Sequence, residues 1–165
     1  MADERAWLGE LLTSVESAPP EMAVSVLARL LAIKLTATEV SFLITDHGGK
    51  AVVRLTGAAA EGGPEHPRPI QLRGSDYEQV VRSQQAHVTS GEREGKGGLG
   101  LVQVIAPVSD RGDAIGLLEL TVPVRPDRQT MQLIVEATHV LAYVVITNTG
   151  KAARTRVAVS GWSSE

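Results

Sequence analysis

Apolar residues near the start of the chain recur at the spacing of amphipathic helices. The stripe of the first predicted helix, over residues 3–17, consists of Leu8, Leu11, Leu12 and Val15. Pro19 and Pro20 end this pattern, and a second apolar stripe predicts a helix that continues to about Lys34. Two helices are therefore expected before the first strand.

After the second predicted helix, the spacing of apolar residues changes from about 3.6 residues, typical of a helix, to 2 residues, typical of a strand. Residues 40–45 alternate between two faces and are rich in strand-forming side chains, whereas residues 46–49 are typical of a turn. Residues 51–55 predict the returning strand, so the first sheet element is expected to be a hairpin.

Short elements separated by loops are predicted for the middle of the chain. Residues 57–69 are rich in Gly, Ala and Pro, and residues 91–100 contain five glycines, so both segments are expected to be loops. Between them the pattern predicts a strand over 70–72, a helix over 76–82 capped by Ser75, and a strand over 87–89.

The clearest pattern is a hairpin of two apolar strands, over residues 101–108 and 114–122. Both faces are apolar, so this hairpin is expected at the centre of a sheet that is covered on both sides. If residues 111–112 form a two-residue turn without a bulge, the pairing places Gln103 and Glu119 on opposite faces. A bulge in the turn would change that pairing.

A long helix is expected from about residue 127 to residue 146, and its apolar residues cover more than one face. Residues 148–165 carry mostly basic charge and are expected to form a flexible tail. The order of elements predicts a single α+β domain over residues 1–147. Its sheet, of about five to six strands, should be largely antiparallel, with the terminal helices on one face. The family resemblance given below implies that the loop and short-helix segment covers the other face.

Composition excludes several classes of function. The chain has no cysteine, which excludes disulfides, iron–sulfur clusters, thiol nucleophiles and cysteine-ligated zinc. Sixteen Lys and Arg against 19 Asp and Glu give a net charge of −3, which is a poor balance for binding nucleic acid. The four histidines are scattered, so no metal site is predicted. With five aromatic residues in all, the chain has few rings on which a cofactor could stack, and no cofactor is expected.

No targeting or membrane segment is predicted. The N-terminus is acidic where a secretory signal would be basic. The longest apolar stretch, residues 140–146, is far shorter than the ~20 residues that cross a bilayer. A cytoplasmic location is therefore expected.

Two motifs bear on chemistry. Gly95 to Gly100 matches G-x-G-x-x-G, but it follows a polar loop and precedes a strand, whereas dinucleotide binding needs the motif to open a helix. Glu119 interrupts an apolar strand, where an unpaired carboxylate would be unfavourable. It is expected either to pair internally or to meet a ligand, an arginine or a histidine in a cavity.

Residues 104–120 resemble the central hairpin of GAF domains, in which an apolar strand ends in Pro-Val or Pro-Leu, a short turn follows, and the next strand reads x-Ile-Gly-x-Leu-x-Leu. Residues 39–46 are similar to the first strand of that family, and the resemblance covers roughly residues 5–147. It implies a GAF-like sheet with a ligand pocket between the sheet and the 57–100 segment. The lining candidates that it implies are Tyr77, His87, Gln103 and Glu119.

A narrower resemblance is to the N-terminal sensory region of actinobacterial serine phosphatases of the PPM, SpoIIE-like class. It rests on residues 137–143, with Thr138 as an insertion. The phosphatase motifs are absent, and so are the cysteines of bilin-binding GAF domains and free-methionine reductases and the Asn-Lys-x-Phe-Asp-Glu signature of cyclic-nucleotide binders. The resemblance therefore implies a non-catalytic regulatory domain in a phosphatase-related pathway, with a phosphatase or regulator as partner.

Two hypotheses remain open. The first is a sensor that binds an unidentified small molecule, and the alternative is a purely structural module that forms a homodimer and binds no ligand. A dimer would use apolar residues of the first and last helices, for which the candidates are Trp7, Leu8, Leu11, Leu12, Val15, Leu141, Val144 and Val145.

Overall fold

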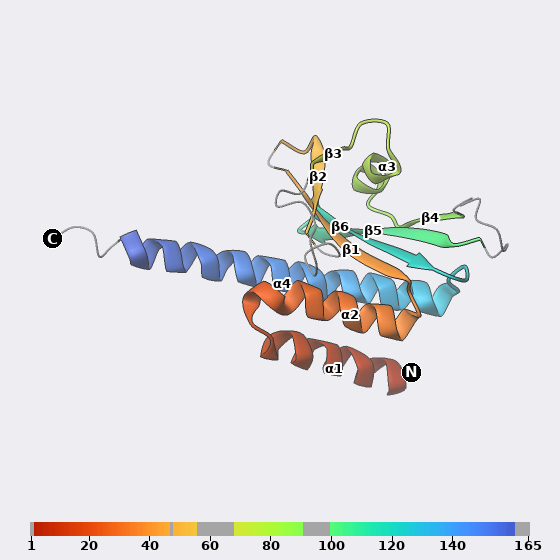
Figure 1. The fold of residues 1–165 in the computed structure, drawn as a ribbon, viewed down its shortest axis with the longest axis horizontal. Coiled ribbons are helices and arrows are strands. Elements are labelled where there is room, and N and C mark those ends of the chain that lie inside the picture. Colours follow the sequence, from red (N-terminus) through yellow and green to blue (C-terminus); the bar gives the residue numbers. More distant parts are fainter. Residues whose placement is uncertain (1, 47, 56–67, 91–99, 161–165) are drawn as a thin grey trace.

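The computed structural model describes residues 2–46, 48–55, 68–90 and 100–160. The elements in chain order are α1 (Ala2–Ser17), the 3-10 turn η1 (Pro20–Met22), α2 (Ala23–Leu35), β1 (Glu39–Thr45), β2 (Ala51–Arg54), β3 (Ile70–Gln71), α3 (Asp76–Ser83), β4 (His87–Ser90), β5 (Val102–Asp110), β6 (Asp113–Val122) and α4 (Arg128–Ser160). The strands form one antiparallel sheet in the order β3-β2-β1-β6-β5-β4. Helices α1, α2 and α4 lie on one side of the sheet and α3 on the other (Figure 1). The predicted α+β architecture is confirmed.

The two faces of the sheet bury two apolar clusters of different size. On the side of α1, α2 and α4, alternate residues of the strands, such as Phe42 and Leu120, pack with helix residues such as Leu31 and Ile134. The smaller cluster under α3 consists of Leu43, Val52, Leu72, Val80, Ile105 and Leu117. Both faces are thus covered, as the apolar pattern of the hairpin predicts.

The turn of the central hairpin has the predicted form, but the strand register differs. Arg111 and Gly112 have φ values of 51° and 92° and form a two-residue turn. The register then shifts between Val108 and Ser109, because β6 holds one extra residue there. The prediction that Gln103 and Glu119 lie on opposite faces was therefore wrong. Gln103 pairs with Thr121, two residues from Glu119, so both side chains face α3.

Gly116 lies in β6 beside this bulge, where another strand approaches closely. A Cβ atom at this position would lie 2.5 Å from the Leu43 carbonyl oxygen and 2.8 Å from the Phe42 ring. The glycine of the x-Ile-Gly-x-Leu pattern is thus required here by the close approach of β1.

Helix α4 is longer than predicted, since it continues to Ser160 instead of ending near residue 146. Residues 148–160 were expected to belong to a flexible tail, but they contain no proline, and the good helix formers Lys151, Ala152, Ala153 and Arg154 follow the single Gly150, so the helix continues. Residues Arg128–Thr147 are long and apolar enough to cross a membrane by length and composition alone. Ile134 and Leu141, however, are fully buried in the core, which accounts for this apolar character without a membrane.

Asp127 caps the N-terminus of α4. Its Oδ1 accepts a hydrogen bond of 2.7 Å from the backbone N–H of Thr130, and hydrogen bonding to Thr130 lowers the pKa of this carboxyl. We expect Asp127→Ala to lower the midpoint of thermal unfolding by a few degrees, because an N-terminal donor of the helix loses its acceptor.

The pH dependence of the stability difference between wild type and Asp127→Ala tests whether the charged carboxylate is responsible. A depressed folded-state pKa means that the stabilisation is complete above the unfolded-state pKa and is lost as the pH falls through the folded-state pKa. The difference between wild type and Asp127→Ala should therefore shrink in acid. Asp127→Asn keeps an acceptor but not the charge, and should retain most of the stability at neutral pH. Equal loss in both variants would contradict the capping role.

Candidate functional site

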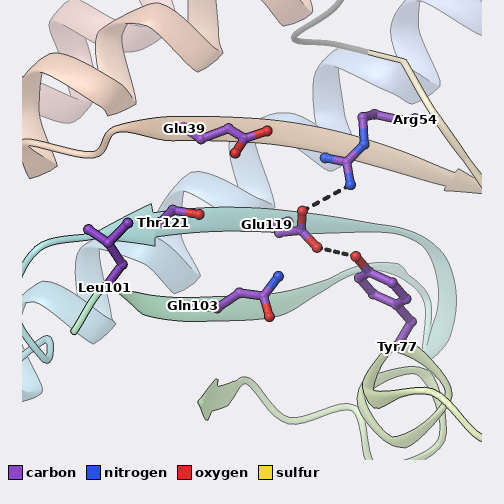
Figure 2. A pocket seen from close by; sticks show the side chains of 7 residues that line it. All are labelled: Glu39, Arg54, Tyr77, Leu101, Gln103, Glu119 and Thr121. Carbon is purple, nitrogen blue, oxygen red and sulfur yellow. Dashed lines mark hydrogen bonds and ion pairs between the residues drawn. The ribbon is translucent and has the colours of Figure 1, made fainter. Parts of the chain in front are cut away.

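A cavity of about 340 Å³ lies on the α3 side of the sheet (Figure 2). Its walls come from strands β1, β2, β5 and β6, with the residue that precedes β5, and from helix α3. The lining residues are Glu39, Arg54, Tyr77, Leu101, Gln103, Glu119 and Thr121. All but one are polar, which distinguishes this part of the sheet from the apolar cluster beside it.

Strand register explains why these residues meet. Directly opposed residues of antiparallel strands point to the same face. Gln103 of β5 is opposite Thr121 of β6, and Thr121 is opposite Glu39 of β1. On the other side of Gln103, Thr89 of β4 continues the row. Four neighbouring strands thus place a continuous polar row on the face that carries the cavity.

Glu119 is the centre of the site. Its Oε1 accepts a hydrogen bond from Nη2 of Arg54 at 3.0 Å, and its Oε2 accepts one from the hydroxyl of Tyr77 (Figure 2). Glu119 is only 7% exposed, so a carboxylate in this place needs such partners. The three side chains join β2, α3 and β6, and Glu119 therefore both pairs internally and lines a cavity.

The electrostatics follow from this burial. Burial alone would lower the pKa of Arg54, but the charge of Glu119 and its hydrogen bond outweigh that effect, and the pKa is raised above its ordinary value. For Tyr77, burial and the hydrogen bond to Glu119 raise the pKa from 10.0 to about 12. At neutral pH the cavity therefore holds a charged guanidinium and a neutral phenol.

Tyr77 should titrate apart from an ordinary tyrosine. We expect tyrosinate absorbance to show a component with a pKa of about 12 that disappears in Tyr77→Phe. Because the folded-state pKa is the higher one, the associated stabilisation is complete below the unfolded-state pKa and is lost as the pH rises through about 12. A titration of wild type in which all tyrosines ionise near pH 10 would contradict the Tyr77–Glu119 bond.

Some buried polar atoms near the cavity have no hydrogen-bond partner among the described residues. These atoms are Nη1 of Arg54, Oγ of Ser41 and Oγ1 of Thr89. Ser41 is opposite Glu119 in the sheet, and Thr89 is opposite Gln103. The guanidinium of Arg54 thus uses one terminal nitrogen for Glu119 and leaves the other unsatisfied.

The structure brings together three of the four predicted lining residues: Tyr77, Gln103 and Glu119. His87 is opposite Ile105 at the edge of the sheet and does not line the cavity. Arg54 and Glu39 were missed, because their position beside Glu119 depends on the strand register and on no local motif. Most of the Gly95–Gly100 motif lies outside the described residues.

The predicted interface residues divide into two groups. Leu11, Val15, Leu141 and Val144 are buried in the core of the single chain, so they are not accessible to a partner. Trp7, Leu8, Leu12 and Val145 are partly buried against that core. In the part of α4 whose side chains the structure describes, up to Thr147, the large apolar side chains that are exposed are Val135, Tyr143 and Ile146. Dimerisation stays a prediction, and these exposed residues are its better candidates.

The described residues form no metal site, and the sequence comparisons identify no family. In the described part of the chain no group of three or more His, Asp or Glu side chains is placed to hold a metal ion. No family model matches the sequence, and no curated protein matches it significantly.

Solved structures show the fold. The GAF domain of a phosphoenolpyruvate-protein phosphotransferase from Coxiella burnetii has a TM-score of 0.74 at 15% identity, over 91% of this chain and 96% of that one. The corresponding Acinetobacter domain has a TM-score of 0.71 at 13% identity, with the same coverage. Free methionine-R-sulfoxide reductase from Neisseria meningitidis, solved with its substrate, has a TM-score of 0.68 at 15% identity, over 90% and 91%. The chain therefore has the GAF fold.

Proposed function

We propose that this chain is a sensory, regulatory domain that binds a small polar molecule in the cavity around Glu119 and does not catalyse a reaction itself. The observation that carries the proposal is the Arg54–Glu119–Tyr77 cluster in the wall of a cavity. A concave site with a few convergent polar groups is what small-molecule recognition requires. Similar structures include the GAF domain of a two-component sensor histidine kinase from Bacillus halodurans, which supports a role in signalling.

The chemistry of the lining residues favours binding over catalysis. Both oxygens of Glu119 are engaged, by Arg54 and by Tyr77, so this carboxylate is not free to accept a proton from a substrate. The pKa of about 12 keeps Tyr77 protonated at neutral pH. One similar structure is a reductase, but the family resemblance implies cysteine chemistry for such enzymes, and this chain has no cysteine.

The signalling context is part of the proposal. Residues 137–143 resemble the sensory region of SpoIIE-like serine phosphatases, so we propose a phosphatase or its regulator as the cytoplasmic partner. Co-purification of such an enzyme with the chain, and a change in its activity on addition of the chain, would test this.

Ligand binding is tested by thermal unfolding against nucleotides, amino acids, organic acids and sugars. A ligand at 100 times its Kd should stabilise the fold by about 2.7 kcal/mol. Arg54→Met should abolish this shift, since the guanidinium lines the cavity. The matched control is Arg82→Met, because the side chain of Arg82 is 80% exposed on α3. A shift that survives in Arg54→Met, or no shift with any compound, would refute the proposal.

The structure also favours a second candidate function, a dimerisation module without a ligand. The supporting observation is the exposure of Val135, Tyr143 and Ile146 on α4, at 41%, 53% and 44%. Light scattering should then give twice the monomer mass, and Tyr143→Asp should reduce it without disturbing the core. Val124→Asp is the control, since Val124 is equally apolar and 72% exposed but lies before α4. A monomer at all concentrations would exclude this function.

A further inference from the structure

We infer that the cavity accepts a free amino acid, that is, a small molecule with a protonated amine beside a carboxylate. This inference rests on the proposed function and specifies its ligand class. It follows from the charges and the unsatisfied atom of two lining residues on neighbouring strands, Arg54 and Glu39.

The acceptor end of the ligand is specified by Arg54. Nη2 of this side chain donates to Glu119, whereas Nη1 is buried without a partner among the described residues. A buried donor that lacks an acceptor is unfavourable, and a charged donor more so. Nη1 itself has almost no accessible surface, but Arg54 lines the cavity and its side chain is 29% exposed. A small rotation of the guanidinium would therefore bring a donor to a ligand carboxylate, a group that Arg binds in bidentate fashion.

The amine end is specified by the balance of charge. Glu39 and Glu119 contribute two carboxylates to the lining and Arg54 one guanidinium, while Tyr77 is neutral. Glu119 is paired, so Glu39 is the negative charge left over at the exposed rim on β1. Figure 2 shows Glu39 and Arg54 on neighbouring strands beside Glu119. A ligand with an ammonium group would complement Glu39, whereas a purely anionic ligand would be repelled by it.

The remaining polar residues of the lining are neutral, and they indicate that the bound amino acid has a polar side chain. Gln103 and Thr121 provide both donors and acceptors, and Leu101 is the single aliphatic residue in the described lining. The volume of about 340 Å³ is at the small end for metabolite sites. Tyr77 is the one aromatic ring in the described lining, which makes the site poorly suited to sandwich a nucleotide base.

A matched set of compounds tests both ends of the ligand. Thermal unfolding is followed with all twenty amino acids, and for L-asparagine also with succinamate, which lacks the amine, and β-alaninamide, which lacks the carboxylate. If another amino acid gives the largest shift, its own deaminated and decarboxylated analogues are used. We expect a polar amino acid to bind, and the Kd of each analogue to be at least about tenfold higher.

Variants assign each end to a residue. Glu39→Gln should weaken binding of the amino acid about tenfold and should not weaken binding of the deaminated analogue, because this variant removes the repulsion between Glu39 and an anion. Arg54→Lys keeps a positive charge beside Glu119 but removes the second terminal nitrogen. It should therefore weaken binding of the amino acid and leave binding of the decarboxylated analogue unchanged. Glu10→Gln, at an exposed position on α1, is the control and should change nothing.

The outcomes separate the two proposals. If a nucleotide, sugar or organic acid stabilises the chain and no amino acid does, the amino-acid inference is wrong and the sensory function stands. If no compound in the broader panel stabilises the chain, both are wrong. If an amino acid binds but is unaffected by Glu39→Gln and Arg54→Lys, the amino-acid site lies elsewhere and this assignment fails.

Discussion

Gly116→Ala is expected to lower the free energy of unfolding by about 2–3 kcal/mol, and Gly116→Val by more. Intrinsic preference predicts the opposite sign, since alanine in a strand is favoured over glycine by roughly 0.5–1 kcal/mol. The contacts outweigh this preference, because the new Cβ would lie 2.5 Å from the carbonyl oxygen of Leu43, which is backbone in the middle of β1. Backbone in a central strand cannot give way as a flexible side chain would.

Gly9 provides the matched control. It is exposed on α1, and no atom lies within 4 Å of where its Cβ would stand, so Gly9→Ala should stabilise the protein by about 1 kcal/mol through helix propensity alone. Urea unfolding of the two variants measures both effects. A neutral or stabilising Gly116→Ala would show that β1 and β6 lie further apart than described.

Glu119→Ala is expected to lower the free energy of unfolding by about 2–4 kcal/mol. It leaves the guanidinium of Arg54 without its ion-pair partner and the Tyr77 hydroxyl without its acceptor, and removing one member of a buried pair typically costs 3–5 kcal/mol. The value should fall towards the lower end, because the Arg54 side chain is 29% exposed and solvent screens its charge in part.

Two comparisons isolate the contribution of burial. Arg82→Ala removes the exposed ion pair of Arg82 with Glu78, at 3.8 Å, and should change the free energy by less than about 0.5 kcal/mol. The double variant Arg54→Met with Glu119→Leu removes both charges together and should recover much of the lost stability. If Glu119→Ala were as mild as Arg82→Ala, the cluster at Glu119 would have no structural role.

The element order could be predicted from sequence because each element carries its own local signal. The helical spacing of Leu8, Leu11 and Val15, the alternation after Glu39 and the Arg111-Gly112 turn all depend on neighbours within a few residues. The end of α4 was missed for the same reason, since polar residues after Thr147 no longer show the apolar period although they continue the helix.

The site was only partly predictable because it depends on register between distant strands. One extra residue in β6 moves Glu119 to the face of Gln103, and no local pattern marks that bulge. Arg54 reaches Glu119 across 65 residues of sequence, through the pairing of β2 with β1 and of β1 with β6. Similarly, an apolar stripe on a helix does not reveal whether Leu141 faces its own sheet or a second subunit.

Strand β5 separates the cavity from α4 by the thickness of a single strand. Gln103 projects from it into the cavity, and its neighbours Val102 and Val104 project into the core on which α4 packs. Helix α4 has 33 residues and is about 50 Å long, and it extends well beyond the sheet (Figure 1). A tilt of about 5° about the N-terminal end of this helix would therefore carry its far end through roughly 4 Å.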